Sequence, residues 1–174
     1  MKLEPMRGKQ IVAVIVLLVV AFLIVVPPLL NGGVKVTLSS TTSVHADHVY
    51  VTIGEISAHR TDISGSSAWQ SISNKSTRVD LSLSNVSETV GLGSLALGHY
   101  ETVRVKVTNA TVIINGTSQK VQLESSLFTI PVSFLTRFGA DTVITLRVST
   151  EVQQTTGGVN LKLSFTAANA SPPS

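Results

Sequence analysis

The sequence has no cysteine, few aromatic residues and little charge. The lack of cysteine excludes cysteine nucleophiles, thiolate metal sites and disulfides, so an exported domain of this chain must depend on its apolar core. Aromatic residues make up only 5% of the chain. We therefore expect Tyr50, Trp69 and Tyr100 to serve core and corner packing, and not stacking on sugars.

The charge balance gives no indication of a nucleic-acid partner. The formal net charge is +3, but Lys2, Arg7 and Lys9 lie in the first ten residues, beside Glu4. The rest of the chain carries ten basic and nine acidic residues and is almost neutral. Nucleic-acid binding requires a basic patch or stripe, so we expect no such partner.

The sequence also lacks the motifs of common enzyme sites. No Gly-x-Ser-x-Gly elbow leads from a strand into a helix, and Gly91-Leu92-Gly93 precedes no helix that would hold a phosphate. We predict that the protein is not an enzyme and uses no cofactor.

One long apolar run, Ile11 to Val26, dominates the N-terminal part of the chain. As a helix it would span about 24 Å, and with the residues to Leu30 it approaches a hydrocarbon core of about 30 Å. The sequence therefore predicts a transmembrane helix or signal anchor at residues 11–30, with the lipid bilayer as its partner. The positive-inside rule leaves residues 1–10 in the cytoplasm and everything after the linker at 31–33 outside.

The N-terminus permits two interpretations of its processing. Arg7-Gly8 before an apolar run resembles the archaeal class III signal of type IV pilins and archaellins, which is cut after Gly8 so that the helix stays on the subunit. The alternative is an uncleaved anchor, because no small-x-small pattern follows Val26 for an ordinary signal peptidase. We prefer the uncleaved anchor.

Beyond residue 33 the pattern alternates with a period of two. Apolar residues alternate with polar ones in several segments, which predicts strands with one buried face. The inward sets include Val34-Val36-Leu38, Val49-Val51-Ile53, Val79-Leu81-Leu83, Val103-Val105-Val107, Ile144-Leu146-Val148 and Leu161-Leu163-Phe165. With no helical pattern after the anchor, we expect an all-β fold: an antiparallel immunoglobulin-like or transthyretin-like β-sandwich at residues 34–167, followed by a flexible tail at 168–174.

Individual residues predict local features of these strands. Gly54 interrupts an alternating segment as a β-bulge would, and Pro131 predicts an edge strand or a bulge. Asn115-Gly116 is the strongest hairpin signal, because both residues tolerate the positive φ of a type I′ turn. The alternation loosens between Ser84 and Gly98, where we assign no strand.

A longer series of motifs resembles a known family. The series is Val34-x-Val36-x-Leu38, Asp47 to Ile56, Trp69, Val79-Asp80-Leu81, Leu97-Gly98-x-Tyr100-x-x-Val103-Arg104-Val105 and Asn115-Gly116. It resembles the exported archaeal and bacterial family called domain of unknown function 4382. The resemblance implies an extracytoplasmic β-sandwich, found in lipoproteins or anchored surface proteins, and brings no known reaction or ligand. This chain has no lipobox cysteine, so its anchor would be protein and not lipid.

Three kinds of candidate site remain. Leu95-x-Leu97-Gly98-x-Tyr100 resembles the tyrosine corner of immunoglobulin-like sandwiches, which gives Tyr100 a structural role. His45, Asp47 and His48 are the one cluster of possible metal ligands, but the alternation puts Asp47 opposite to His48, so we favour a strand entry with Asp47 capping a turn. Five sequons are candidate glycosylation sites, at Asn74, Asn85, Asn109, Asn115 and Asn169.

The sequence leaves two functions open. The first is a single-pass cell-surface protein with a non-catalytic role in adhesion, envelope organisation or ligand binding, whose partners are envelope proteins, glycans or identical subunits. The alternative is an archaeal type IV pilin-like filament subunit, in which the N-terminal helix forms the fibre core and the glycosylated sandwich forms the coat.

Overall fold

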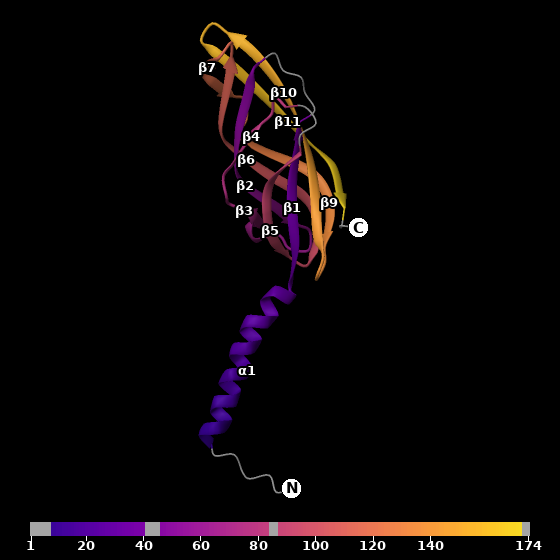
Figure 1. Ribbon diagram of the computed structural model, residues 1–174. Coiled ribbons are helices and arrows are strands. Elements are labelled where there is room, and N and C mark those ends of the chain that lie inside the picture. The colour runs from indigo at the N-terminus through magenta and orange to yellow at the C-terminus, as the bar shows by residue number, and fades with distance from the viewer. Residues whose placement is uncertain (1–7, 41–45, 84–86, 172–174) are drawn as a thin grey trace.

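One N-terminal helix leads into two β-sheets that face each other (Figure 1). The computed structural model describes residues 8–40, 46–83 and 87–171. Its elements are α1 (Gly8–Leu29), β1 (Asn31–Ser40), β2 (His48–Arg60), η1 (Ser66–Ala68), β3 (Trp69–Ser73), β4 (Thr77–Asp80), β5 (Ser87–Ala96), β6 (Gly98–Ile114), β7 (Thr117–Gln119), β8 (Val121–Leu123), β9 (Leu127–Thr136), β10 (Asp141–Thr155) and β11 (Gly158–Ser171). The all-β prediction is confirmed for the part of the chain that follows α1.

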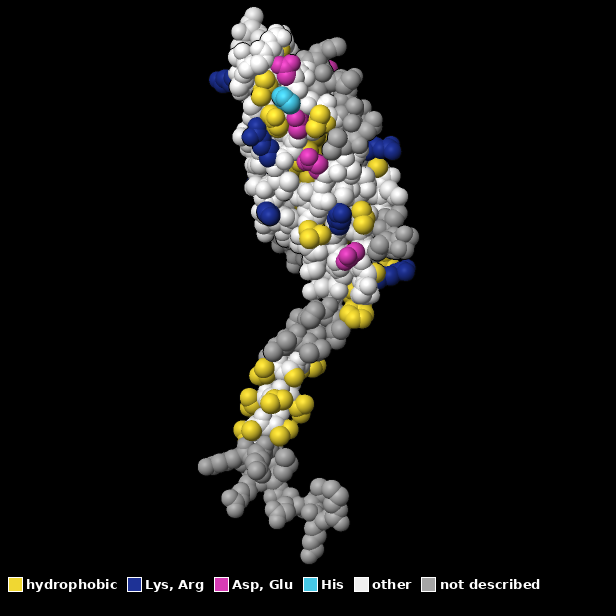
Figure 2. Space-filling model, in the orientation of Figure 1, with side chains coloured by type: hydrophobic (Ala, Val, Ile, Leu, Met, Phe, Trp, Pro, Cys, Tyr) yellow, Lys and Arg dark blue, Asp and Glu magenta, His cyan; other side chains and the backbone are white. Residues whose placement is uncertain are grey.

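The helix α1 presents apolar side chains to its surroundings. Side chains of α1 are described over residues 12–22, and the large apolar ones among them are exposed by 45% to 70%. Figure 2 shows these hydrophobic side chains around the described part of the helix. Within the residues that the structure describes, no helix meets both the length and the apolarity needed to cross a membrane.

The strand order corrects the prediction of a purely antiparallel fold. One sheet, which we call sheet A, has the order β5-β1-β10-β11-β8, and in it β1 runs parallel to β10 and β11 parallel to β8. The other, sheet B, contains β3, β4, β2, β6, β7 and β9, and its pairs are antiparallel. Side chains alternate between the two faces with a period of two in parallel and in antiparallel strands. The sequence alone therefore could not distinguish the two kinds of pairing.

The two sheets share one apolar core. The inward sets predicted from the alternation are buried there almost completely: Val36, Val49, Val51, Ile53, Val103, Ile144, Leu146 and Val148 are at most 1% exposed. Leu83 and Phe165 are exceptions, because Leu83 is 49% exposed and Phe165 only packs against the edge of the core. The burial of alternate residues from both sheets is what holds the layers together.

Strand β5 occupies the segment in which the sequence predicted none. Its residues Gly91 and Gly93 lie where β5 of sheet A approaches sheet B. A Cβ atom on Gly93 would lie within bonding distance of the Ile72 carbonyl oxygen in β3, and one on Gly91 would lie 2.9 Å from the Ile56 side chain. Glycine, which weakens a strand in isolation, is needed here for close contact between layers.

The predicted boundaries of the β domain also shift. The predicted linker at 31–33 forms the start of β1 and pairs with β5 and β10, and the predicted tail at 168–174 begins as β11, which pairs with β10 as far as Ser171. At the other side of the linker, α1 continues through Pro27 and Pro28 to Leu29. Pairing with a neighbouring strand outweighs the local flexibility that Asn and Gly suggest. Pro27 and Pro28 lack the N–H groups that would donate to carbonyls four residues earlier, and the helix ends one residue after them.

Three local predictions are confirmed. The β2–β6 register shifts between Ile53 and Ile56, around Gly54. Pro131 lies in β9, which pairs with β6 beside a further register shift. Asn115 and Gly116, with φ values of 51° and 72°, form the two-residue turn between β6 and β7.

Replacing Gly116 by alanine should therefore destabilise the protein. The new Cβ meets no atom within 4 Å, so the cost comes from the left-handed backbone alone and should be about 1 kcal/mol. The matched control is Gly157→Ala in the β10–β11 turn, where there is also no atom within 4 Å and φ lies outside the left-handed region. Chemical denaturation of both variants checks this. Equal stabilities would contradict the type I′ geometry.

Candidate functional site

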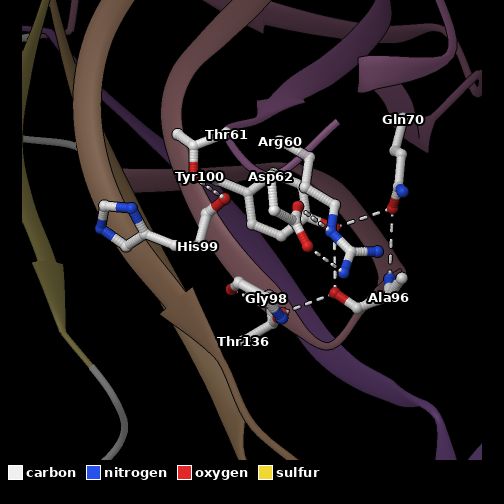
Figure 3. Close-up of polar contacts among 9 residues, drawn as sticks. All are labelled: Arg60, Thr61, Asp62, Gln70, Ala96, Gly98, His99, Tyr100 and Thr136. Carbon is white, nitrogen blue, oxygen red and sulfur yellow. Dashed lines mark hydrogen bonds and ion pairs between the residues drawn. The ribbon is translucent and has the colours of Figure 1, made fainter. Parts of the chain in front are cut away.

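Tyr100 is the centre of a buried hydrogen-bond network where β5 turns into β6 (Figure 3). Its hydroxyl lies 2.9 Å from the carbonyl oxygen of Ala96, four residues upstream, and 2.7 Å from Oε1 of Gln70 in β3. The Ala96 N–H also donates to Gln70, and the Thr136 hydroxyl donates to the Ala96 carbonyl at 2.7 Å. This is the return contact of a tyrosine corner, extended here to a second strand.

The surroundings of Tyr100 keep its phenol neutral. The residue is fully buried, and its ring stacks on Phe134 with the centroids 5.1 Å apart. Burial raises the pKa of Tyr100 above its usual value, while the nearby Arg60 lowers it and Asp62 raises it. A neutral hydroxyl can donate to Ala96 or Gln70 at every physiological pH.

Two of the three candidate metal ligands, Asp47 and His48, contact different partners. Oδ2 of Asp47 accepts a hydrogen bond from the Gly116 N–H at 2.8 Å, so this carboxylate caps the β6–β7 hairpin. His48 turns instead to Asp80, with Nδ1 and Oδ2 2.7 Å apart. His45 lies outside the described residues. Among the residues that the structure does describe, no group of three or more His, Asp or Glu side chains is placed to hold a metal ion.

The pair of His48 and Asp80 is a polar site that the sequence did not predict. Burial by itself would raise the pKa of Asp80, but hydrogen bonds from Ser82, from His48 and from the Val49 N–H outweigh it and hold the pKa below its usual value. The Asp80 side chain is 13% exposed and that of His48 is 45% exposed. The arrangement resembles the base and orienting acid of a hydrolase, but it ties β2 to β4 and to Ser82 beyond the end of β4.

Aromatic and basic side chains stack in two places on the outer face of sheet B. Arg78 lies 4.0 Å from the centre of the Tyr50 ring, which itself stacks on His48. Arg104 lies 3.7 Å from the centre of the Trp69 ring, and His59 contacts the same ring edge-on. Tyr50 and Trp69, which were expected in the core or corner, therefore lie half-buried on the surface. Their positions in the register of β2, β3 and β4 direct them to the outer face, and composition alone does not show this.

A shallow groove adjoins the second of these stacks. It has a volume of about 310 Å³ and is lined by Glu55, Ser57, Arg104, Lys106, Ser126 and Leu127. A larger groove, of about 530 Å³, lies on sheet A between β8 and the β10–β11 hairpin. The first groove combines two cations, a carboxylate and an apolar wall, which suits a polar or anionic ligand.

The sequons lie on the surface wherever the structure describes them. Asn74, Asn109, Asn115 and Asn169 are exposed, and Asn85 lies outside the described residues. Asn74 follows β3, Asn109 lies within β6, and Asn115 is in the β6–β7 turn. Gly8, the predicted processing position, is the first residue of α1.

Removing the Tyr100 hydroxyl should destabilise the fold. In Tyr100→Phe the Ala96 carbonyl and Gln70 lose a buried donor, which should lower the free energy of unfolding by about 1–2 kcal/mol. Tyr50→Phe is the matched control, since Tyr50 is a half-buried tyrosine on the outer face of sheet B. Thermal and chemical unfolding measure the difference. An unchanged Tyr100→Phe variant would argue against the corner.

The Asp80 carboxylate should make stability depend on pH. Its folded pKa is lower than its unfolded value, so its contribution is complete above about pH 4 and is lost as the pH falls through the folded pKa. Asp80→Asn should lower the stability at pH 7 and flatten this acid-side loss. The exposed Glu101→Gln serves as the control in the same denaturation series. A variant that keeps the wild-type slope below pH 4 would contradict this assignment.

The comparisons with known proteins show the family of the chain. No curated protein and no solved structure matches it. A family model described as "Domain of unknown function (DUF4382)" matches residues 31–170, which run from the first residue of β1 almost to the end of β11. The β domain with its Tyr100 corner is thus the matched unit, and the chain belongs to the DUF4382 family.

Proposed function

We propose that the protein is a single-pass, membrane-anchored cell-surface protein whose β domain binds a partner without catalysing a reaction. In this proposal α1 holds the chain in the bilayer with the N-terminus inside. The β domain is an immunoglobulin-like or transthyretin-like sandwich outside the cell. Its partners are envelope proteins, glycans or further copies of the chain.

The exposed apolar surface of α1 is the observation that carries the proposal. Leu17 and Phe22 are 70% and 64% exposed, and the other large apolar side chains described in α1 are exposed in the same way. A helix that is apolar all round requires an apolar environment. The length needed for a crossing is supported by the sequence run from Ile11 to Leu30.

The charges and sequons support the orientation. Lys2, Arg7 and Lys9 precede the apolar run, as expected for a cytoplasmic flank. The exposed sequons at Asn74, Asn109, Asn115 and Asn169 lie on the other side of it and become glycan acceptors only if this side is translocated.

The outer face of sheet B is the binding surface that we assign to this function. It combines the Arg78–Tyr50 and Arg104–Trp69 stacks with the groove between Glu55 and Lys106. Stacked aromatic and guanidinium groups supply a rigid contact area with hydrogen-bond donors at its rim. This favours polar or anionic groups on a glycan or an envelope protein.

A filament subunit is the alternative. The same apolar surface of α1 would then pack against α1 of neighbouring copies, with the β domain as a glycosylated coat and processing after Gly8. Such a subunit would begin at Lys9 in the native protein.

A charge in the middle of α1 should release the protein from membranes. Leu17→Lys introduces an ammonium group at an insertion cost of about 3 kcal/mol. The matched control is Leu92→Lys in β5, because Leu92 is exposed to nearly the same extent, 73% against 70%. We expect carbonate-washed membranes to retain the wild type and Leu92→Lys but to lose much of Leu17→Lys.

Two outcomes would change this interpretation. Wild-type protein extracted by carbonate would contradict the anchor. Retention of the wild type together with a native N-terminus at Lys9 in the mass spectrum, and filaments in negative stain, would favour the subunit of a fibre over the isolated surface protein.

A further inference from the structure

An exposed phenylalanine marks the end of the β domain at which α1 leaves it. Phe138 lies in the β9–β10 turn, between Arg137 and Gly139, and is 60% exposed. The turn is well formed, with Gly139 at a φ of 69° and the Ala140 N–H directed to the Arg137 carbonyl. A large apolar side chain at the tip of this turn is therefore mostly exposed to the surroundings of the domain.

The turn lies beside the first residues that follow α1. A Cβ atom on Gly32 would lie 2.7 Å from the Arg137 carbonyl oxygen, and Gly33 pairs with Asp141 at the start of β10. On the other side, the Leu97 N–H donates to the Leu30 carbonyl at 3.0 Å. Figure 1 shows the β9–β10 turn at the end of the β domain that faces α1.

This placement brings Phe138 to the level of a membrane surface. The apolar run ends at Leu30, and two residues of extended chain carry Gly32 only about 7 Å further. A headgroup region is about 5–8 Å deep on each side of the hydrocarbon core. The turn that touches Gly32 is therefore within reach of the bilayer in which α1 ends.

We infer that Phe138, with Leu30 beside the exit of the chain, inserts into the interfacial layer of the same bilayer and seats this end of the β domain on the membrane. This inference rests on the proposed anchor. Leu30 is 57% exposed, so both apolar side chains are available to lipid. Aromatic and leucine side chains are the usual residues that bury at the boundary of headgroups and acyl chains.

The charges at this end fit a bilayer without net charge. Arg137 and Asp141 are both exposed at the two ends of the turn, and the guanidinium of Arg60 is paired with Asp62, with Nη2 and Oδ2 2.6 Å apart. Each of these basic residues thus has an acidic residue within a few positions of it in the chain, and Arg137 can bind a lipid phosphate while Phe138 enters the layer below it. Apolar insertion, and not attraction to anionic lipid, would hold the domain on the surface.

The experiment uses the full chain, which has no native cysteine. Single cysteines replace Phe138, Leu92, Thr156 and Leu17, one in each variant, and carry a nitroxide label in phosphatidylcholine vesicles. Phe138 is the test position, Leu92 is an exposed leucine in β5, Thr156 lies in the β10–β11 turn, and Leu17 reports on the anchor. Collision rates with oxygen, which is enriched in lipid, and with a water-soluble nickel complex give the depth of each label. Thermal unfolding shows that each labelled variant is folded.

We expect the oxygen-to-nickel ratio at positions 17 and 138 to exceed that at 92 and 156 several-fold. A lipid-exposed label at 17 together with a water-exposed label at 138 would overturn the insertion of Phe138 but leave the membrane anchor intact. A water-exposed label at 17 would overturn the membrane anchor and therefore also the insertion of Phe138. A label at 138 that neither reagent reaches would also overturn the inference, because protein and not lipid would then cover the turn.

Discussion

The structure depends on the fit between two sheets that bury their apolar faces against each other. Val36, Leu146 and Val148 from sheet A join Val51, Ile53 and Val105 from sheet B in a single apolar cluster. The sheets lie close together where Gly93 in β5 passes the Ile72 carbonyl in β3. Any side chain at position 93 would force the layers apart, so this contact limits both the spacing of the sheets and the sequence that can form it.

The network around Tyr100 completes this fit at the end of the domain next to α1. Its hydroxyl, Gln70 and Thr136 satisfy the buried polar groups of the β5–β6 connection, which would otherwise carry a large desolvation cost. The same connection holds the Leu30 carbonyl through Leu97. The connection that carries this polar cluster therefore also holds the segment between α1 and β1. If that segment is rigid, the anchor would set the orientation of the whole β domain.

The chain thus combines two parts that differ in where their apolar side chains lie. The β domain hides its valines and isoleucines from water and presents stacked arginines, aromatics and sequons. The helix α1 presents its apolar side chains outward. In our proposal the bilayer covers this second surface, and the family match, which begins at residue 31, coincides with the change from one part to the other. The proposed binding face on sheet B would then be presented at a fixed height above the membrane.

Sequence patterns alone predict the apolar helix, the all-β class, the inward residues of most strands, the bulge at Gly54 and the turn at Asn115-Gly116. These features depend on residues that are close in the chain: the strands on the alternation of apolar and polar residues, and the turn on the tolerance of Asn and Gly for positive φ. Tertiary contacts were needed to show that β1 and β10 pair in parallel, that a glycine-rich segment forms β5, and that His48 contacts Asp80 and not Asp47. Each of these depends on residues that are far apart in the sequence. No local sequence pattern indicates which strands pair or which distant side chains meet.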